Sequence, residues 1–548
     1  MKGKRKKKRV LGRKISNQQW LQFKPYTLMT RYDNYYLGKA THVYKILRLH
    51  KSWFDSYGFT SKDLGTLACI LTSHFEDFIN EIGIWQFFQQ TNKKLYGHPL
   101  PLYDLSDYDE DYLNPADFSY LIWHFMCKTT NRVFAPDAPA ILQIGTAIYE
   151  FFEPLIEDAL ATDVYDKLLQ LDEATHFYEV KERLKWFALG TYTMGNEFAK
   201  HMVEAINDFM LKEDGMNRVM SVDMYSYTIQ DDYLYARHSS FSALSCLEWF
   251  VGIANCSEDL KQNILGLKQR IMSPLYFEGE EANYWLFRQL QTNEVLKIRK
   301  ESVTLKKEVQ VEGYMQMMNL VKWKGDWWMS GTTIGYGQIS EKEKDKMRKD
   351  IANTPFYANS EENQQKLRSA TDDMEKYFVE YFGSNVVLFE TQKELQAAMQ
   401  TQNEYYNKNR VIDKEAGKKA QENYDKKYKG KDIWGQLNFD YAKGLGLIFL
   451  PKVGNIIDPD MVNLINIMKT PSIDKQGEAF LFNNLVGEGT HPYVSNYLLE
   501  NYPTHNFKFP IAASRVDVMR EKDFLMRFLN PQEFKTPIPN TRHMASGD

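Results

Sequence analysis

The spacing of apolar residues in the first half of the chain limits the possible folds more than any other feature of the sequence. After Ser61, apolar side chains recur at three- and four-residue intervals, at Leu64, Leu67, Ala68, Leu71, Phe75, Phe78 and Ile82. This stripe predicts an amphipathic α-helix with Ser61 as its N-cap. Asn114 followed by Pro115 predicts the start of another helix, because proline is favoured in the first turn. Similar patterns predict helices near residues 138–161, 173–189, 196–212 and 257–271.

The pattern changes near residue 300, where apolar residues begin to alternate. Apolar residues stand at every second position, or close to it, at Val303, Leu305, Val309 and Val311, which is the two-residue period of a strand. We expect a second strand over 315–323, then a turn at Lys324-Gly325-Asp326 that leads into Trp327-Trp328-Met329. Together these segments predict a β-hairpin.

The rest of the chain alternates short apolar runs with helical patterns. Residues 386–389 and 445–450 predict strands, the second bounded by Gly444 and Pro451. Helical spacing recurs near 361–382, 391–406, 459–468, 476–486, 492–500 and 521–529. Gly487 to His491 contains two glycines between helical patterns, and we interpret it as a helix–helix turn.

These patterns predict a mainly α fold, in which a helical N-terminal domain is followed by an α+β region with a small antiparallel sheet. A chain of 548 residues exceeds the size of one core, so several domains are expected. Hydrophobic residues make up 43% of the chain, which excludes wholesale disorder. The predicted boundaries are a cationic arm at 1–14, a helical domain at 15–295, an α+β region at 296–407, a charged helix or linker at 408–432 and a C-terminal α+β region at 433–548.

Charge is distributed very unevenly along the chain. Residues 1–14 contain nine Lys and Arg and no acid, whereas the remaining residues carry 59 Lys and Arg against 72 Asp and Glu. The arm therefore has a net charge of +9 and the body −13. Such a dense basic segment has no apolar face to bury, so we predict that it is disordered alone and binds a polyphosphate by releasing counterions. The predicted nucleic-acid-binding residues are Lys4, Arg5, Lys6, Lys7, Lys8, Arg9, Arg13 and Lys14.

Two other interpretations of the arm remain open. It could be a solvated tail with only non-specific affinity, or a contact for an anionic membrane surface. No neighbouring amphipathic helix or lipidation signal supports the membrane interpretation.

Several classes of protein are disfavoured by what the sequence lacks. Its cysteines, at 69, 127, 246 and 256, form no C-x-x-C pair, which argues against a disulfide framework and a thiolate zinc site. No phosphate-binding glycine motif or compact histidine spacing occurs, so we predict no metal site and no cofactor. Polar residues follow the basic amino terminus, and no apolar run is long enough to span a bilayer, so a cytoplasmic location without a membrane span is expected.

A few residues nevertheless deserve a chemical interpretation. Glu179-Val180-Lys181 has the E-x-K form of metal-dependent nucleases, but its helical spacing favours a charged helix face. His74 and Asp77 share a helix face, where a solvent-facing polar pair is favoured over a metal site. The tryptophans at 323, 327 and 328 could stack bases, although core packing in the hairpin is favoured.

The remaining candidates concern nucleophilic catalysis. His124 and Cys127 share an apparently buried helix, where a cysteine is usually inert. His238-Ser239-Ser240 is polar, but closeness in sequence does not establish a triad in space.

Patches at both ends of the chain resemble an uncharacterised protein family of Bacteroidetes bacteria. At the amino-terminal end they are Trp20, Lys24-Pro25-Tyr26, Asp33-Asn34-Tyr35-Tyr36-Leu37 and Asp117-Phe118-Ser119-Tyr120-Leu121-Ile122-Trp123-His124. At the carboxyl-terminal end they are Pro492-Tyr493-Val494, Leu498-Leu499, Tyr502 and Phe524-Leu525. The resemblance implies a bacterial cytosolic setting and brings no catalytic residue with it. The basic arm is not a feature of that family.

The sequence therefore favours a non-catalytic binding protein. In this interpretation the arm engages RNA, DNA or a ribonucleoprotein, while the acidic body contacts proteins. One alternative is a metal-dependent hydrolase or nuclease whose acids, such as Asp77 or Glu179, assemble from distant positions. Another is a structural subunit of a larger assembly, which the aromatic content of 14% suggests.

Overall fold

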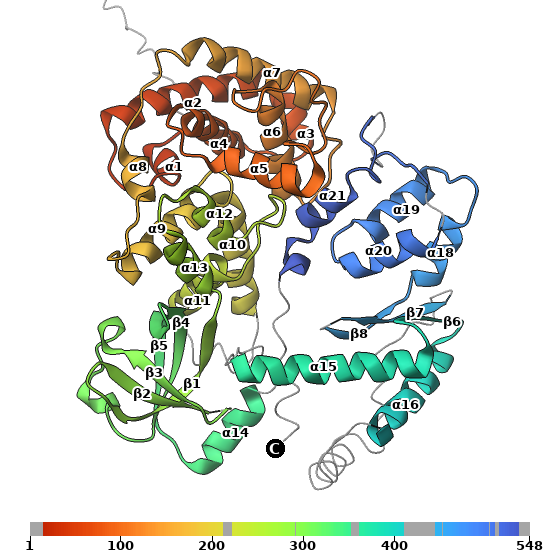
Figure 1. The fold of residues 1–548 in the computed structure, drawn as a ribbon. Helices are drawn as coiled ribbons and strands as arrows, with labels where there is room; N and C mark the ends of the chain where they lie inside the picture. The colour runs from red at the N-terminus through yellow and green to blue at the C-terminus, as the bar shows by residue number, and fades with distance from the viewer. Residues whose placement is uncertain are drawn as a thin grey trace, which may run out of the picture. The chain divides into compact units, whose positions relative to one another are not determined.

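The chain divides into two compact units, which are drawn in Figure 1. Unit 1 comprises Met1–Leu265 and Asn506–Phe534, and unit 2 comprises Gly266–His505 and Lys535–Asp548. The computed structural model describes residues 15–211, 222–290, 292–351, 361–409, 444–451, 453–502, 505–509 and 514–535. The predicted arm, the segment 410–432 and the last thirteen residues lie outside these ranges. The fold class is as predicted, with a helical amino-terminal region followed by an α+β region that contains a small antiparallel sheet.

Unit 1 is built from helices. In chain order they are α1 (Asn17–Leu21), α2 (Arg31–Leu49), α3 (Lys51–Ser56), α4 (Ser61–Ile79), α5 (Ile84–Tyr96), α6 (Pro115–Thr130), α7 (Pro139–Phe152), η1 (Glu153–Leu155), α8 (Val164–Leu169), α9 (Phe177–Gly190), α10 (Gly195–Leu211), α11 (Val222–Tyr235), α12 (Cys246–Ile253), α13 (Glu258–Gly266), α21 (Lys522–Leu529) and η4 (Pro531–Phe534). Among the described helices, none combines the length and apolarity needed to cross a bilayer.

Helix α4 lies at the centre of unit 1. Its N-cap is Thr60 and not Ser61, because the Thr60 hydroxyl accepts from the Asp63 N–H while the Asp63 carboxylate accepts from the Thr60 N–H, a capping box. Nearly every side chain from Leu64 to Asp77 is buried. A helix covered on all sides has no solvent face, so its polar residues are buried as well.

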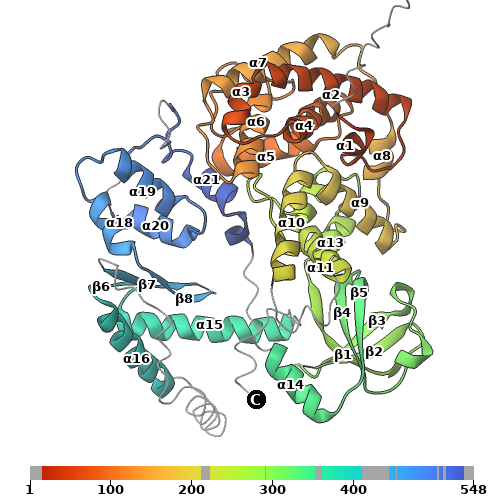
Figure 2. The same cartoon turned by 180° about the vertical axis from the view of Figure 1, so that it is seen from behind.

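The carboxyl-terminal helix α21, drawn in Figure 2, belongs to unit 1, although residues Gly266–His505 of unit 2 intervene in sequence. The Phe528 ring lies 4.5 Å from that of Trp123, measured between centroids, and its carbonyl oxygen accepts a hydrogen bond of 2.7 Å from Lys128 Nζ. Phe524 and Leu525 are also buried. The core of unit 1 is therefore completed by a segment far from the rest of it in sequence.

Unit 2 begins with a closed five-stranded barrel. Its strands are β1 (Arg270–Glu280), β2 (Tyr284–Gln289), β3 (Val295–Arg299), β4 (Tyr314–Trp323) and β5 (Asp326–Gln338). Their order is β1-β2-β3-β5-β4, and β4 pairs with β1 to close the barrel. All the strand pairs are antiparallel except β3 with β5, which is parallel.

The β4–β5 hairpin confirms the predicted turn. Lys324 and Gly325 both have positive φ, 48° and 86°, as a two-residue type I′ loop requires. The predicted strand over 303–311 is wrong. This segment follows one short 3₁₀ helix, η2 (Lys300–Ser302), and contains another, η3 (Lys307–Val309), and it places Val303, Leu305 and Val309 against the barrel core. When single apolar residues of an irregular segment pack against a core at every second position, their spacing is the same as that of a strand.

A second, three-stranded antiparallel sheet lies further along unit 2. Its strands β6 (Val386–Phe389), β7 (Leu445–Leu450) and β8 (Gly454–Asp458) have β7 in the middle. Helices α15 (Glu361–Phe382) and α16 (Gln392–Asn409) share a core with β7, and α18 (Met461–Met468) approaches it closely at Gly446, where a Cβ would meet the Met461 side chain. The other helices of unit 2 are α14 (Glu341–Ile351), α19 (Lys475–Leu485) and α20 (Pro492–Asn501).

Replacement of Leu525 by alanine tests the contribution of α21 to unit 1. Leu525 is fully buried, so Leu525→Ala should lower the free energy of unfolding by about 2–5 kcal/mol through lost burial and the cavity left behind. Leu49, which is 82% exposed, provides the matched control, and Leu49→Ala should change stability by less than about 0.5 kcal/mol. Urea unfolding measures both. Equal effects of the two substitutions would contradict the docking of α21.

Candidate functional site

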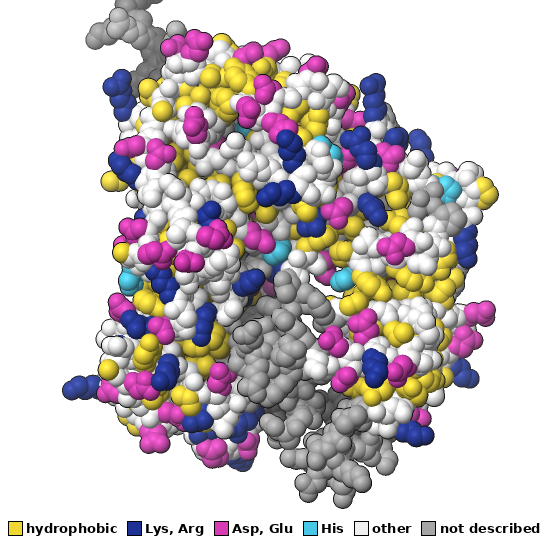
Figure 3. Space-filling view, viewed as in Figure 1, with side chains coloured by type: hydrophobic (Ala, Val, Ile, Leu, Met, Phe, Trp, Pro, Cys, Tyr) yellow, Lys and Arg dark blue, Asp and Glu magenta, His cyan; other side chains and the backbone are white. Residues whose placement is uncertain are grey.

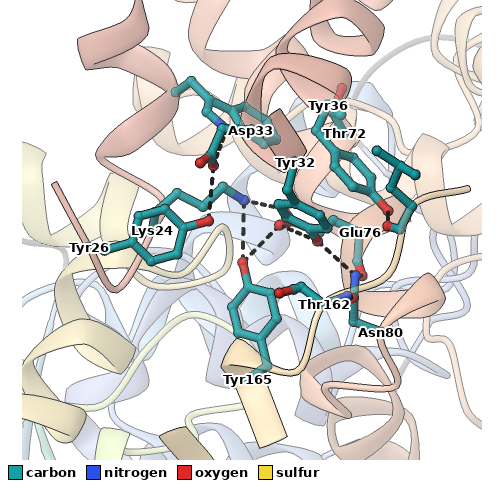
Figure 4. Close-up of polar contacts among 12 residues, drawn as sticks. Lys24, Tyr26, Tyr32, Asp33, Tyr36, Thr72, Glu76, Asn80, Thr162 and Tyr165 are labelled. Atoms are coloured by element: carbon teal, nitrogen blue, oxygen red, sulfur yellow. Dashed lines mark hydrogen bonds and ion pairs between the residues drawn. The ribbon is translucent and has the colours of Figure 1, made fainter. Parts of the chain in front are cut away.

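A group of buried charged and hydroxyl-bearing side chains in unit 1 surrounds Glu76 of α4 (Figure 4). The Glu76 carboxylate forms an ion pair with Lys24, from the segment after α1, and both side chains are 1% exposed. Its other oxygen, Oε1, accepts hydrogen bonds of 2.8 Å from the hydroxyls of Tyr32 and Tyr165. A carboxylate without water is stable only if donors replace its hydration, and here three donors from three segments do so.

The neighbouring pKa values agree with this arrangement. Burial lowers the pKa of Lys24, and the nearby Glu76 carboxylate opposes that shift. Burial, reinforced by the same carboxylate, raises the pKa of Tyr32 and of Tyr165. Both phenols therefore keep their protons and act as donors to Glu76.

A second branch of the network fastens the segment that follows the arm. Asp33 Oδ1 accepts from Trp20 Nε1 at 3.1 Å and from the Tyr26 hydroxyl at 3.0 Å. Its other oxygen caps α2 through the N–H of Thr30. Ile15 and Trp20 are fully buried, so the chain is held in place from its first described residue.

A second buried acid group lies further round α4. Asp77 accepts hydrogen bonds from the backbone N–H groups of Ile84 and Trp85 and from the Tyr192 hydroxyl, and so it caps the start of α5. Burial raises its pKa to about 6, although these hydrogen bonds oppose the shift. Asp77 is only 3% exposed and His74 only 2%, so the solvent-facing pair expected from the sequence is wrong. The cause is the central position of α4, which leaves it no solvent face.

Asp117 joins His74 at this second group. It stands in the first turn of α6, accepts a hydrogen bond of 2.5 Å from the Tyr108 hydroxyl and lies 3.9 Å from His74 Nε2. Burial raises the pKa of Asp117 to about 7 and lowers that of His74 to about 3. The pair is therefore held close to its uncharged form, as a dry environment favours.

The contacts around α4 are those of a structural network. Each carboxylate oxygen of Glu76 and Asp77 already accepts a hydrogen bond from a protein donor. Within the described ranges, no group of three or more His, Cys, Asp or Glu is arranged to hold a metal ion. The network joins α1, α2, α4, α5 and α8, and it fixes the point from which the arm departs.

One histidine and one serine meet elsewhere in unit 1, although the sequence gave no reason to pair them. His124 Nε2 lies 2.7 Å from Ser240 Oγ and 3.2 Å from Glu197 Oε1, and Ser240 Oγ also hydrogen-bonds to Glu197. In a catalytic triad the hydroxyl and the carboxylate occupy opposite ring nitrogens. Here both contact the same nitrogen, so the carboxylate cannot orient the imidazole as a base for the serine. Cys127 on the same helix is buried, as predicted, and burial raises the pKa of its thiol to about 12.

The other predicted residues are placed as follows. Glu179 and Lys181 lie on helix α9, as their spacing predicted, and Lys181 Nζ forms an ion pair of 2.9 Å with the buried Asp231. The three tryptophans are at most 9% exposed, which confirms core packing over base stacking. The segment 487–491 connects α19 and α20, as predicted. The arm residues from Lys4 to Lys14 lie outside the described residues, so their role stays a prediction.

The Glu76 network itself was not predicted from the sequence. One signal was present, because His74, Glu76 and Asp77 interrupt a helix whose other residues are largely apolar. The partners of Glu76, by contrast, come from positions as distant as Lys24 and Tyr165 and share no spacing that could be recognised in the sequence.

Comparison with known proteins adds a family and no activity. Residues 14–270 match the model of a family described as "Protein of unknown function (DUF3843)", which confirms the resemblance to an uncharacterised family. No curated protein and no solved structure matches the chain. The matched region ends where the first strand of the barrel begins, so most of unit 2 and helix α21 lie beyond it.

Removal of one partner from the Lys24–Glu76 ion pair tests the network. Lys24→Met leaves the Glu76 carboxylate buried without its cation, and we expect a loss of about 3–5 kcal/mol in the free energy of unfolding. The double variant Lys24→Met/Glu76→Leu removes both charges and should recover much of that loss. Urea unfolding of the two single variants and the double variant gives the coupling energy. Additive losses would show that the two groups do not interact.

The pH dependence of stability tests the environment of Asp117. Its pKa rises from 3.8 in the unfolded chain to about 7 in the folded protein, so folding takes up a proton between these values. The free energy of unfolding, measured relative to Asp117→Asn, should therefore increase as the pH falls from 8 towards 5, by at most about 1.4 kcal/mol per pH unit. The exposed control Asp111→Asn should run parallel to the unmodified protein.

Proposed function

We propose that this chain, whose amino-terminal region resembles an uncharacterised family, is a non-catalytic bacterial cytoplasmic protein that engages nucleic acid or a ribonucleoprotein through its basic arm. The observation that carries the proposal is the charge of +9 on residues 1–14, joined to a body of net charge −13. An acidic body repels a polyphosphate as a whole, so the attraction has to be concentrated in the arm.

The surface of the body supports this division of roles. On the face drawn in Figure 3, basic and acidic side chains are interspersed and form no broad basic field. Contacts from the arm to phosphates would discriminate little between base sequences of the nucleic acid, because the sugar–phosphate backbone is the same for every base. RNA and DNA are both suitable partners, since arginine-rich segments commonly become ordered only on binding.

The anchoring of residues 15–33 gives the arm a fixed origin. Trp20 and Ile15 are fully buried, and Lys24 is held in the Glu76 network. Fourteen residues can span at most about 50 Å, so the arm can search for phosphates only within that distance of its origin. A tethered arm also raises the local concentration of any second contact that the body makes.

Protein partners for the body are the second part of the proposal. Val203 and Met210 on α10 are 59% and 64% exposed, and Tyr227 on the neighbouring α11 is 50% exposed. Exposed apolar side chains on adjacent helices are a common feature of protein-binding surfaces.

Deletion of residues 2–14 tests the arm. The full-length protein should bind a fluorescently labelled single-stranded oligonucleotide with an affinity that falls steeply with salt, because six to nine phosphate contacts on a single strand give a slope of log K against log [salt] of about −4 to −6. The deletion variant should lose most of this affinity and of the slope. Anisotropy titrations across a salt series measure both, and circular dichroism shows whether the fold is intact.

A scrambled arm provides the matched control. It keeps the composition of residues 2–14 and changes only their order, so it should bind as the natural arm does if charge alone is responsible. Equal and negligible binding by the full-length and deleted proteins would overturn the proposal and leave the arm as a solvated tail. The search would then move to protein partners of the body.

A further inference from the structure

The barrel of unit 2 has the strand order and pairing of an OB-fold. Its order is β1-β2-β3-β5-β4, and β3 runs parallel to β5. The long strand β1 pairs with two strands, with β4 through residues 270–276 and with β2 through residues 275–280. The pairing with β2 has an irregularity between Phe277 and Gly279. The segment between β3 and β4 places Val303, Leu305 and Val309 against the barrel core. This barrel type holds oligonucleotides or oligosaccharides on the outer face of strands 2 and 3 and on the neighbouring loops.

We propose that the outer face of β2 and β3 binds single-stranded nucleic acid by stacking a base on Tyr284. This inference rests on the proposed function and adds a second contact to it. The alternation of the two strands defines the face: Trp285, Phe287, Leu296 and Ile298 belong to the barrel core, so the intervening residues point outward. The outward residues are Tyr284, Leu286, Arg288, Val295, Lys297 and Arg299.

Tyr284 is the centre of this face. It pairs with Arg299 across the two strands, and the Arg299 guanidinium lies 5.5 Å from the centroid of its ring. Lys297 Nζ lies 5.9 Å from the same centroid. The Tyr284 hydroxyl donates a hydrogen bond of 3.2 Å to Asp326, which places the ring beside the β4–β5 turn as well as the β1–β2 turn. The aromatic ring can stack on a nucleotide base, and the two cations beside it can contact the phosphate of the same nucleotide.

The charges on the face determine what kind of binding it can support. Lys297 pairs with Glu281 at 2.8 Å, Arg299 with Glu301 at 3.0 Å, and Arg288 with Glu278. These pairs are partly exposed, so each contributes little and its cation can exchange the carboxylate for a phosphate. Because such an exchange is nearly neutral, affinity would come from stacking and would depend weakly on salt. Binding through the arm, by contrast, would depend steeply on salt.

Two features favour a single strand over the other candidates. A duplex keeps its bases stacked on one another, so none is available to Tyr284, whereas a single strand offers every base. A neutral oligosaccharide has no planar base to stack on Tyr284, so it lacks the contact that would supply most of the affinity. The barrel therefore fits a short single-stranded segment, within the range of about 4–16 nucleotides that one barrel of this type covers.

The test uses the full chain with the eight predicted arm residues changed to glutamine, so that only the body can bind. Labelled twelve-nucleotide oligo(dT) and oligo(U) are titrated by anisotropy, with a twelve-base-pair duplex and maltoheptaose as competitors. We expect binding of the single strands with weak salt dependence. Tyr284→Ala should weaken it about 5- to 150-fold, the equivalent of one lost base–aromatic stack. Tyr284→Phe keeps the ring and should bind normally, and Tyr112→Ala, at a tyrosine of unit 1 that is 40% exposed, is the matched control.

A second variant protects the test against misfolding of Tyr284→Ala. The Lys297 side chain is 56% exposed, so Lys297→Glu should leave the barrel folded and still weaken binding to the single strands. Unchanged affinity in both Tyr284→Ala and Lys297→Glu would overturn the proposal. So would equal binding of the duplex, or binding of maltoheptaose alone.

The two proposals can fail separately. If neutralising the arm abolishes all binding, the arm proposal stands and the barrel proposal falls. If the neutralised chain binds as tightly as the unmodified chain and depends on Tyr284, the barrel proposal stands and the arm proposal falls.

Discussion

The buried carboxylate of Glu76 sets the arrangement of the amino-terminal part of unit 1. A charge removed from water has to be compensated by donors at hydrogen-bond distance, and those donors come from Lys24, Tyr32 and Tyr165. Each belongs to a different segment, so the network fixes the relative positions of several helices at once. Hydrogen bonds and ion pairs require particular distances and angles, so these few polar contacts define the positions of the helices more narrowly than apolar packing alone would.

The same network links the fold to the proposed function. In the proposed function, the basic arm needs a fixed origin if it is to bring a partner to the rest of the molecule. Here Ile15 and Trp20, which follow it closely, are buried, and the Trp20 indole donates a hydrogen bond to Asp33, so the arm is tethered to a well-packed body. The two proposed contacts would act over different ranges, because attraction between charges in solution extends over about a Debye length, whereas stacking requires contact. Their combination in one chain would increase affinity through local concentration.

The chain path explains why the domains are hard to recognise in sequence. Most of unit 2 is inserted between α13 and α21, so unit 1 consists of two segments that no local pattern connects. Helix α21 is amphipathic, and its spacing alone predicted a helix near 521–529. Its apolar face packs on Trp123 and Tyr120, and only the tertiary structure shows which core it completes.

Local features of the structure were determined by the sequence itself. The helices and the β4–β5 hairpin follow from spacing, capping residues and a turn that tolerates positive φ, all of which depend on a few neighbouring residues. The strand predicted at 303–311 was wrong because Val303, Leu305 and Val309 pack against the barrel core at alternating positions without forming a strand. The burial of His74 and Asp77, the donors of Glu76, the contact of His124 with Ser240 and the closure of the barrel were decided only by the tertiary structure. Each of them depends on which distant segments come into contact. A hydrogen bond or a ring contact between residues about a hundred positions apart produces no periodic pattern that could be recognised in the sequence.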